Sequence, residues 1–260
     1  MANPKRIVSL VPSTTETLFA LGAFDRVVGV TRFCVHPHDA RERARVVGGT
    51  KNPRIETILA LAPDLILANQ EENRREDVER LREHVPVEVF YPRDVAQAVA
   101  DIRSLGRLVE EPENAEAIAR DIERECSALR PLERGQVRYL YFIWRRPYMV
   151  AGPSTFIEAL LAEAGFVNRA PVDRGRYPEM EPEEIRRSDA DVFLLASEPF
   201  PFEEKHLGEL GERSVLADGE LLSWHGARLR EGLPYVRVLA ERFSSTKSTS
   251  SARPSPDPSP

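Results

Sequence analysis

The chain has 260 residues, of which 42% are hydrophobic and 30% charged, a balance typical of a soluble globular protein with substantial cores. Two lobes of about 100 residues each are expected at this length, since that is a common domain size. The 36 basic residues are scattered among 42 acidic ones, giving a net charge of -6, so we expect no nucleic-acid partner.

The first residues and the cysteines place weak limits on cellular location. No apolar run approaches the roughly 20 residues that cross a bilayer. Residues 1–6 lead into a strand pattern without the apolar core of a signal peptide. Cys34 and Cys126 lie in different predicted environments, so no disulfide framework is implied and the redox compartment stays undecided.

Residues 6–108 alternate between short apolar strands and amphipathic helices, as expected of an α/β lobe. Strand patterns occupy 6–11, 26–31, 64–68 and 87–91. Helix patterns begin near Pro12, Ile55 and Val95. The strand at 64–68 is apolar on both faces, which indicates a parallel sheet covered by helices on both sides.

The second half of the chain follows a long helical pattern between Pro112 and Pro131 that carries one apolar stripe. We predict a linking helix at 109–132 and a second α/β lobe at 133–243. Residues 244–260 form a Ser-, Thr- and Pro-rich tract that cannot bury enough surface to order itself, so we expect a disordered tail.

The two halves are similar to each other. Pro12–Gly22 is echoed by Pro153–Gly165, and residues 55–68 are echoed by 183–196. Parallel sheets carry their ligand-contacting loops at the carboxyl ends of the strands. We therefore predict an α/β fold of two lobes with mainly parallel central sheets, joined by one long backbone helix, with a ligand cleft between the lobes.

Hydroxyl and aromatic side chains fall where these loops are expected. Ser13 and Thr14 stand at a helix start, where they could either cap the helix or hold a carbonyl or anionic group of a ligand. Aromatic residues occupy predicted strand ends and loops at Phe33, Tyr91, Trp144, Tyr148, Tyr177 and Trp224. Such rings suit a large flat ligand, although some of them are expected to be lobe core.

Cys34, His36 and His38 alternate along an apparently extended segment and could face one side. A zinc site is one interpretation, but no fourth ligand is evident at a suitable spacing. The protein alone is therefore expected to hold no metal, with His36 an axial contact to the metal of a bound chelate. In the second lobe, Glu198 and the segment Trp224, His225 and Arg228 are the leading ligand-binding candidates.

No catalytic constellation is found in the sequence. A nucleophile elbow, a Walker loop, a zinc-protease motif and a strand-anchored dinucleotide fingerprint are all missing, and most carboxylates lie on solvated helix faces. We expect a binding protein without a catalytic activity or a cofactor.

The order and spacing of several motifs resemble one known family. These motifs are Arg6–Glu16, Leu21–Val30, Val47–Gly49, Asn52–Glu56 and Leu61–Ile66. They are similar to the cobalamin and iron-chelate binding proteins of ABC importers, whose two lobes are joined by a single long helix. The resemblance implies a monomeric, extracytoplasmic protein that captures cobalamin or a related corrinoid and delivers it to a membrane permease. Haem or a ferric siderophore is the alternative ligand, and a cytoplasmic chelate-binding or sensing protein is the alternative role.

The resemblance also implies roles for individual residues. Phe33, the pair Tyr177–Pro178 and Trp224 match aromatic contacts to cobalamin, although Ser223 stands where the best-known cobalamin binders have an acidic residue. Family members dock to the permease through one glutamate on each lobe. Glu183 matches the second-lobe position. In the first lobe the closest match is an arginine, and the neighbouring Glu76 is predicted to serve instead.

Overall fold

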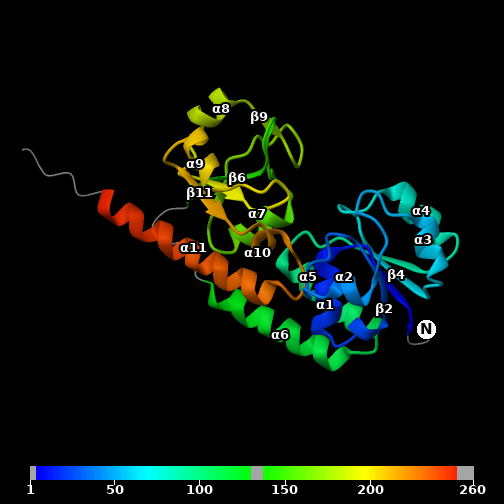
Figure 1. The fold of residues 1–260 in the computed structure, drawn as a ribbon. Helices are drawn as coiled ribbons and strands as arrows, with labels where there is room; N and C mark the ends of the chain where they lie inside the picture. Colours follow the sequence, from blue (N-terminus) through cyan, green and yellow to red (C-terminus); the bar gives the residue numbers. More distant parts are fainter. Residues whose placement is uncertain (1–3, 130–136, 251–260) are drawn as a thin grey trace, which may run out of the picture. The chain divides into compact units, whose positions relative to one another are not determined.

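The computed structural model describes residues 4–129 and 137–250, with side chains described as far as Phe243. The chain divides into two compact units, whose elements are labelled in Figure 1. The N-terminal unit contains the residues up to Glu125 together with Ser223–Glu231, which we call the return segment. The C-terminal unit contains Cys126–Leu222 and the residues from Gly232 onward.

The N-terminal unit is built on a five-stranded sheet in the order β3-β2-β1-β4-β5, in which every neighbouring pair is parallel. The strands are β1 (Ile7–Ser9), β2 (Val27–Val30), β3 (Arg45–Val46), β4 (Leu65–Asn69) and β5 (Val87–Phe90). The chain moves outward from β1 in one direction and then returns to add β4 on the other side. In open α/β sheets ligands bind at such a reversal, outside the carboxyl ends of the strands.

Helices connect these strands and cover the sheet. They are α1 (Pro12–Ala20), the short 3₁₀ helix η1 (Phe24–Arg26), α2 (Ala40–Arg43), α3 (Ile55–Ala60), α4 (Arg75–Arg82), α5 (Val95–Leu108) and α6 (Pro112–Ala128), of which the residues up to Glu125 belong to this unit. Local sequence determines where two of these helices begin. Pro12 occupies the first turn of α1, and the Asp94 carboxylate caps α5 by accepting a hydrogen bond from the backbone N–H of Gln97. All five residues of β4 are buried, as its apolar sequence predicts.

The C-terminal unit contains a six-stranded mixed sheet. Its strands are β6 (Arg138–Trp144), β7 (Tyr148–Val150), β8 (Val167–Asn168), β9 (Glu179–Met180), β10 (Val192–Ala196) and β11 (Ser214–Ala217). The order is β11-β10-β6-β7-β9, with β8 also paired to β6. Strands β6, β8, β10 and β11 are parallel, whereas β7 pairs antiparallel with β6 and β9.

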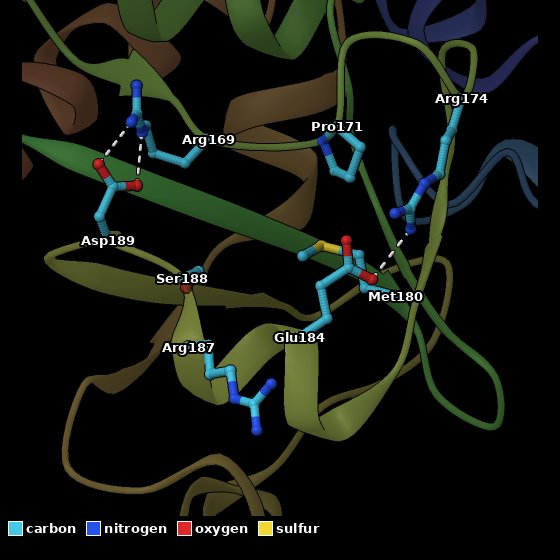
Figure 2. A pocket seen from close by; sticks show the side chains of 8 residues that line it. All are labelled: Arg169, Pro171, Arg174, Met180, Glu184, Arg187, Ser188 and Asp189. Atoms are coloured by element: carbon cyan, nitrogen blue, oxygen red, sulfur yellow. Dashed lines mark hydrogen bonds and ion pairs between the residues drawn. The ribbon is translucent and has the colours of Figure 1, made fainter.

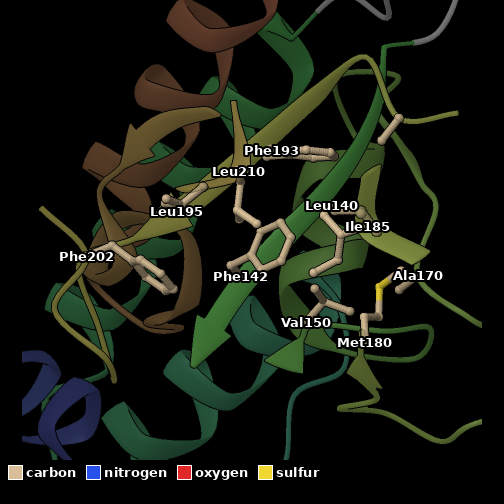
Figure 3. Packing of buried hydrophobic residues seen from close by; sticks show 11 residues of the cluster. Leu140, Phe142, Val150, Ala170, Met180, Ile185, Phe193, Leu195, Phe202 and Leu210 are labelled. Atoms are coloured by element: carbon tan, nitrogen blue, oxygen red, sulfur yellow. The ribbon is translucent and has the colours of Figure 1, made fainter. Parts of the chain in front are cut away.

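The helices of this unit are α7 (Phe156–Ala162), α8 (Pro182–Arg187), α9 (Glu204–Leu210), α10 (Gly219–Ser223) and α11 (Leu229–Ser250), although the last residue of α10 and the first three of α11 belong to the return segment. Figure 3 shows the core on one face of the sheet, where Phe142 of β6, Phe193 and Leu195 of β10 and Ile185 of α8 are fully buried. The predicted fold class, two α/β units with mainly parallel sheets, is confirmed.

The predicted boundaries differ from the structure in two places. The return segment was expected in the second lobe but groups with the N-terminal unit, so the predicted span 133–243 is interrupted. Helix α11 continues to Ser250, although disorder was expected from residue 244. The end of the predicted linking helix and the rest of the tail lie outside the described residues. No helix in the described part of the chain is long and apolar enough to span a membrane.

Candidate ligand-binding site

The first turn of α1 follows β1 at the carboxyl edge of the N-terminal sheet. Ser13 and Thr14 lie inside this turn and are buried. The residue at the cap position is Val11, and no side chain caps the helix. Capping therefore does not explain the hydroxyls, and their contact with a ligand stays a prediction.

The loop after β2 presents an aromatic ring. Phe33 is 49% exposed, and the guanidinium carbon of Arg32 lies 5.2 Å from its ring centroid. Arg32 also donates to the side-chain oxygen of Asn52 over 3.1 Å, which ties this loop to the one that follows β3. An exposed ring beside a cation thus lies in the loop after β2, at the edge of the sheet where a ligand is predicted to bind.

The return segment attaches to α1 through a shared hydroxyl. The Thr17 hydroxyl donates to the carbonyl of Ser13 over 2.7 Å and accepts from the backbone N–H of Ala227 over 3.0 Å. Gly226 has a φ of +96°, and a Cβ on it would lie 2.3 Å from Thr17 Oγ1. Only glycine permits this approach.

We expect Gly226→Ala to destabilise the protein more than Gly175→Ala. Both glycines have positive φ, but a Cβ at Gly175 meets no atom within 4 Å. The backbone strain common to both costs about 1–2 kcal/mol, and the clash at Gly226 adds about 1–3 kcal/mol. Urea unfolding measures both, and equal losses would show that the contact with Thr17 is not tight.

His225 of the return segment joins the end of β4. The side-chain oxygen of Asn69 accepts from the backbone N–H groups of Glu71 and Glu72, which turns the Asn69 amide nitrogen toward His225. That nitrogen lies 3.2 Å from His225 Nε2, so Nε2 is the acceptor and must be unprotonated. Protein atoms surround the imidazole ring, although part of the residue is accessible to solvent. This burial lowers the pKa of His225 to about 4.

The pKa of His225 predicts a loss of stability on acidification. Because its folded pKa of about 4 lies below the ordinary 6.5, the unfolded chain binds the extra proton between these values, and stability falls as pH falls through that window. The loss due to this group is on the order of 2–3 kcal/mol. Unfolding free energies between pH 7 and 4 should show a shallower dependence on pH in His225→Gln than in the parent, and an equal dependence in the two proteins would contradict this prediction.

A chain of contacts links α1 to the loop after β2 through the return segment. Arg228 makes two contacts with the Glu16 carboxylate, at 2.9 and 2.8 Å, and both side chains are mostly buried. Its guanidinium carbon lies 5.4 Å from the Trp224 ring centroid, and Trp224 meets His36 edge-on at 5.5 Å. Burial raises the pKa of Glu16 even though Arg228 lowers it, so the pair is heavily desolvated.

Two predictions about this region need correction. Trp224, His225 and Arg228 were expected to act from the second lobe, but they belong to the N-terminal unit, and Trp224 is only 8% exposed. Cys34 does not share a face with His36, because it is fully buried with its sulfur within 3.2 Å of the Thr15 and Thr31 hydroxyls. Within the described residues, no three His, Cys, Asp or Glu side chains are placed to hold a metal ion.

The predicted ligand-binding residues of the C-terminal unit differ in how exposed their side chains are. Trp144 ends β6 and is 42% exposed, and its ring meets Phe200 edge-on at 5.8 Å. Tyr177 is 39% exposed. Pro178 is buried and lies beside the backbone of Gly152, and its contact with a ligand stays a prediction. Glu198 is half-buried, with its stem against Gly219.

A groove of about 530 Å³ also opens in the C-terminal unit, beside α8 (Figure 2). Its lining includes two ion pairs, Arg169 with Asp189 and Arg174 with Glu184. None of the predicted ligand-binding residues lines this groove. The two predicted docking glutamates, Glu76 and Glu183, are exposed in the first turns of α4 and α8.

Sequence reasoning missed several residues that build the site. Glu16, Thr17 and Asn69 each hold one residue of the return segment. Glu16 and Thr17 adjoin the hydroxyl pair in the first family motif, which was the available signal. Their partners could not be identified, because they lie more than 150 residues away in the chain.

Comparison with known proteins identifies the family. A family model described as periplasmic binding protein matches residues 7–211. The chain belongs to the periplasmic binding protein family. The resemblance inferred from the motifs is therefore confirmed, and the chain is a solute-binding protein of the ABC-importer type, not an enzyme. Members of this family are extracytoplasmic.

Relatives of this periplasmic binding protein include two vitamin B12-binding proteins. The protein of Vibrio parahaemolyticus is 29% identical over 205 residues, covering 75% of this chain and 73% of the relative. The protein of Pectobacterium carotovorum is 26% identical over 203 residues, covering 76% and 73%.

Solved structures share the fold. The vitamin B12-binding protein BtuF of Vibrio cholerae superposes with a TM-score of 0.81 at 21% identity, covering 94% of this chain and 98% of that one. The heme-binding protein RhuT from Roseiflexus sp. RS-1 gives 0.78 at 24% identity, covering 92% and 99%. The same fold therefore accompanies two different ligands.

Proposed function

We propose that this protein captures cobalamin or a related corrinoid and delivers it to the permease of an ABC importer. The observation that carries the proposal is an exposed ring at a carboxyl strand end in each unit, Phe33 after β2 and Trp144 at the end of β6. Flat apolar faces of this kind suit a corrin ring. The vitamin B12-binding relatives support the same ligand.

Haem is the second candidate, and one observation favours it. Arg32 stands beside the ring of Phe33 and is held there by Asn52. A fixed guanidinium recognises carboxylates well, and haem carries two of them. Heme-binding proteins of the same fold make this alternative concrete.

Fluorescence quenching separates the candidates, because the chain has two tryptophans. The purified protein is titrated with cyanocobalamin, haemin and a ferric siderophore, and Trp144→Phe identifies the signal of the exposed ring. Saturable quenching by cyanocobalamin at the lowest concentration supports the proposal. Tighter binding of haemin or of the siderophore would mean that the protein carries that ligand instead of a corrinoid. An absence of quenching by all three ligands would contradict the proposal.

We further propose that Glu56, and not Glu76, is the docking carboxylate of the N-terminal unit. Asp64 and Asp191 play the same part in the two units, because each accepts from the backbone N–H at the start of the central strand, that of Arg6 or Arg138. Each aspartate also returns its own N–H to the carbonyl of that residue. The two positions are thus structurally equivalent.

The equivalence extends into the preceding helices. Six residues before each aspartate stand the fully buried Ile58 and Ile185. Eight residues before each stand Glu56 and Glu183, each in the first turn of its helix. Both are exposed and paired with arginine, Glu56 with Arg80 and Glu183 with Arg186 and Arg187. Glu76 belongs to a different helix.

Charge reversal tests this assignment. Glu56→Arg and Glu183→Arg should each weaken association with the permease by tenfold or more, since a like charge opposes a basic docking surface. Ligand affinity of the isolated protein should be unchanged. The matched control is Glu76→Arg, which should associate normally. Loss of association in Glu76→Arg but not in Glu56→Arg would show that Glu76, as predicted from the sequence, is the docking carboxylate.

A further inference from the structure

The loops after β1, β2, β3 and β4 lie at the carboxyl edge of the N-terminal sheet, because all these strands are parallel. The chain reverses its direction of winding between β1 and β4, and the loops after two such strands diverge and leave a crevice. In this unit the side chain of Asn73 spans the point of reversal. Asn73 lies in the loop between β4 and α4 and is 5% exposed.

The Asn73 side chain hydrogen-bonds to three segments of the chain at once. Its oxygen accepts from the backbone N–H of Asn69, at the end of β4, over 2.8 Å. Its amide nitrogen donates to the carbonyl of Leu10, in the loop after β1, over 3.3 Å and to that of Thr50, in the loop after β3, over 3.0 Å. Both N–H donors and the oxygen of the amide are therefore engaged with backbone groups.

Further hydrogen bonds join the loop after β3 to the loop that carries the exposed ring of Phe33. The backbone N–H of Arg32 donates to the carbonyl of Gly48 over 2.8 Å, and its guanidinium donates to Asn52 over 3.1 Å. Thr50 stands between these two acceptors in the chain. The loop after β3 is thus held by the buried amide on one side and holds the neighbour of Phe33 on the other.

We propose that Asn73 is a positioning residue for ligand binding, which fixes the loops after β1, β3 and β4 to one another and so holds Phe33 in place. Because Asn73 is buried, it acts through these loops and not by touching the ligand. This role rests on the proposed function, in which Phe33 contacts the ligand. Neither the family motifs nor the aromatic positions of the sequence indicate Asn73.

Hydrogen exchange tests the loop contacts without any ligand. A carboxyl group donates at most one hydrogen bond, so in Asn73→Asp at least one of the two carbonyls loses its partner while the size of the side chain is kept. Amide exchange in residues 28–36 and 47–54 should become at least about threefold faster, because these loops then open at a lower cost in free energy.

The matched control is Asn168→Asp in the C-terminal unit. The Asn168 side chain also donates to a backbone carbonyl, that of Ala151, and accepts from a backbone N–H, that of Ala170. Asn168 is paired with Tyr139 near the amino end of β6, on the edge of the sheet opposite the carboxyl ends. Exchange in residues 28–36 and 47–54 should be unchanged in this variant.

Isothermal titration with cyanocobalamin measures the consequence for binding. Asn73→Asp should bind about three- to tenfold more weakly than the parent. In the Phe33→Ala background the same change should have less than about a twofold effect, because the ring that Asn73 positions is gone. A residue that only stabilises the fold would weaken binding equally in both backgrounds. Asn168→Asp should bind as the parent does.

Unchanged exchange in residues 28–36 and 47–54, or equal effects of Asn73→Asp on binding in the two backgrounds, would overturn the proposal. Should Asn73→Asp fail to fold, Asn73→Ser takes its place in both measurements, since one hydroxyl also donates a single hydrogen bond. A parent protein that does not bind cyanocobalamin contradicts the proposed function, and hydrogen exchange then still decides whether Asn73 fixes the loops. A parent that binds it no better than Asn73→Asp contradicts the role of Asn73 alone.

Discussion

Trp224→Ala should lower the free energy of unfolding by about 3–5 kcal/mol, the usual cost of removing a buried large aromatic side chain. The indole is 8% exposed and lies against both His36 and Arg228. Its removal leaves a cavity beneath the loop after β2 and uncovers the Glu16 ion pair. Urea unfolding followed by circular dichroism measures the loss without relying on tryptophan fluorescence.

Trp144→Ala is the matched control. Its ring is 42% exposed, so we expect little loss of folding stability, but a loss of ligand affinity of about 1–3 kcal/mol if the ring stacks on the ligand. The two tryptophans should thus show opposite effects. Unchanged stability in Trp224→Ala together with weakened ligand binding would restore the view that Trp224 is a wall of the ligand site.

Arg228→Leu should cost about 3–5 kcal/mol of folding stability, because it leaves the Glu16 carboxylate buried without its charge partner. The double variant Glu16→Leu/Arg228→Leu should recover most of that loss. This follows from the raised pKa of Glu16, which shows that desolvation outweighs the attraction of Arg228. Chemical denaturation of the two single variants and the double variant completes the cycle.

An exposed ion pair provides the control for that cycle. Arg75 and Glu79 are in contact at 2.5 Å, but their side chains are 87% and 54% exposed. Arg75→Leu should therefore change stability by no more than about 1 kcal/mol. If Arg228→Leu were equally mild, the pair with Glu16 would not be the buried link between the return segment and α1.

Much of the fold could be predicted because local signals agree with it. The apolar run at Leu65–Asn69, the proline at the start of α1 and the turn at Gly22 each specify an element without help from distant residues. The similarity between the two halves of the sequence predicted that the second unit would have the same type of fold as the first. The aromatic positions Phe33 and Trp144 also followed from strand ends, and both rings are exposed there.

The return segment could not be predicted, because its position depends on contacts between residues far apart in the chain. Ala227 bonds to Thr17 across 210 positions, and His225 to Asn69 across 156. Sequence order placed Trp224 in the second lobe, whereas one glycine with positive φ and one hydroxyl bring it to the first. The same nonlocal contacts explain why Trp224 is buried although it was predicted to lie at a strand end or in a loop.

Isothermal titration of cyanocobalamin into the parent protein and into Phe33→Ala tests the central claim most directly. We expect one-to-one binding to the parent, and binding at least about tenfold weaker to Phe33→Ala, since about 1.4 kcal/mol of ring contact corresponds to that factor. The variant should fold as stably as the parent, because Phe33 is half exposed. Absence of binding to the parent, or equal binding by both proteins, would contradict corrinoid capture at this edge of the N-terminal sheet.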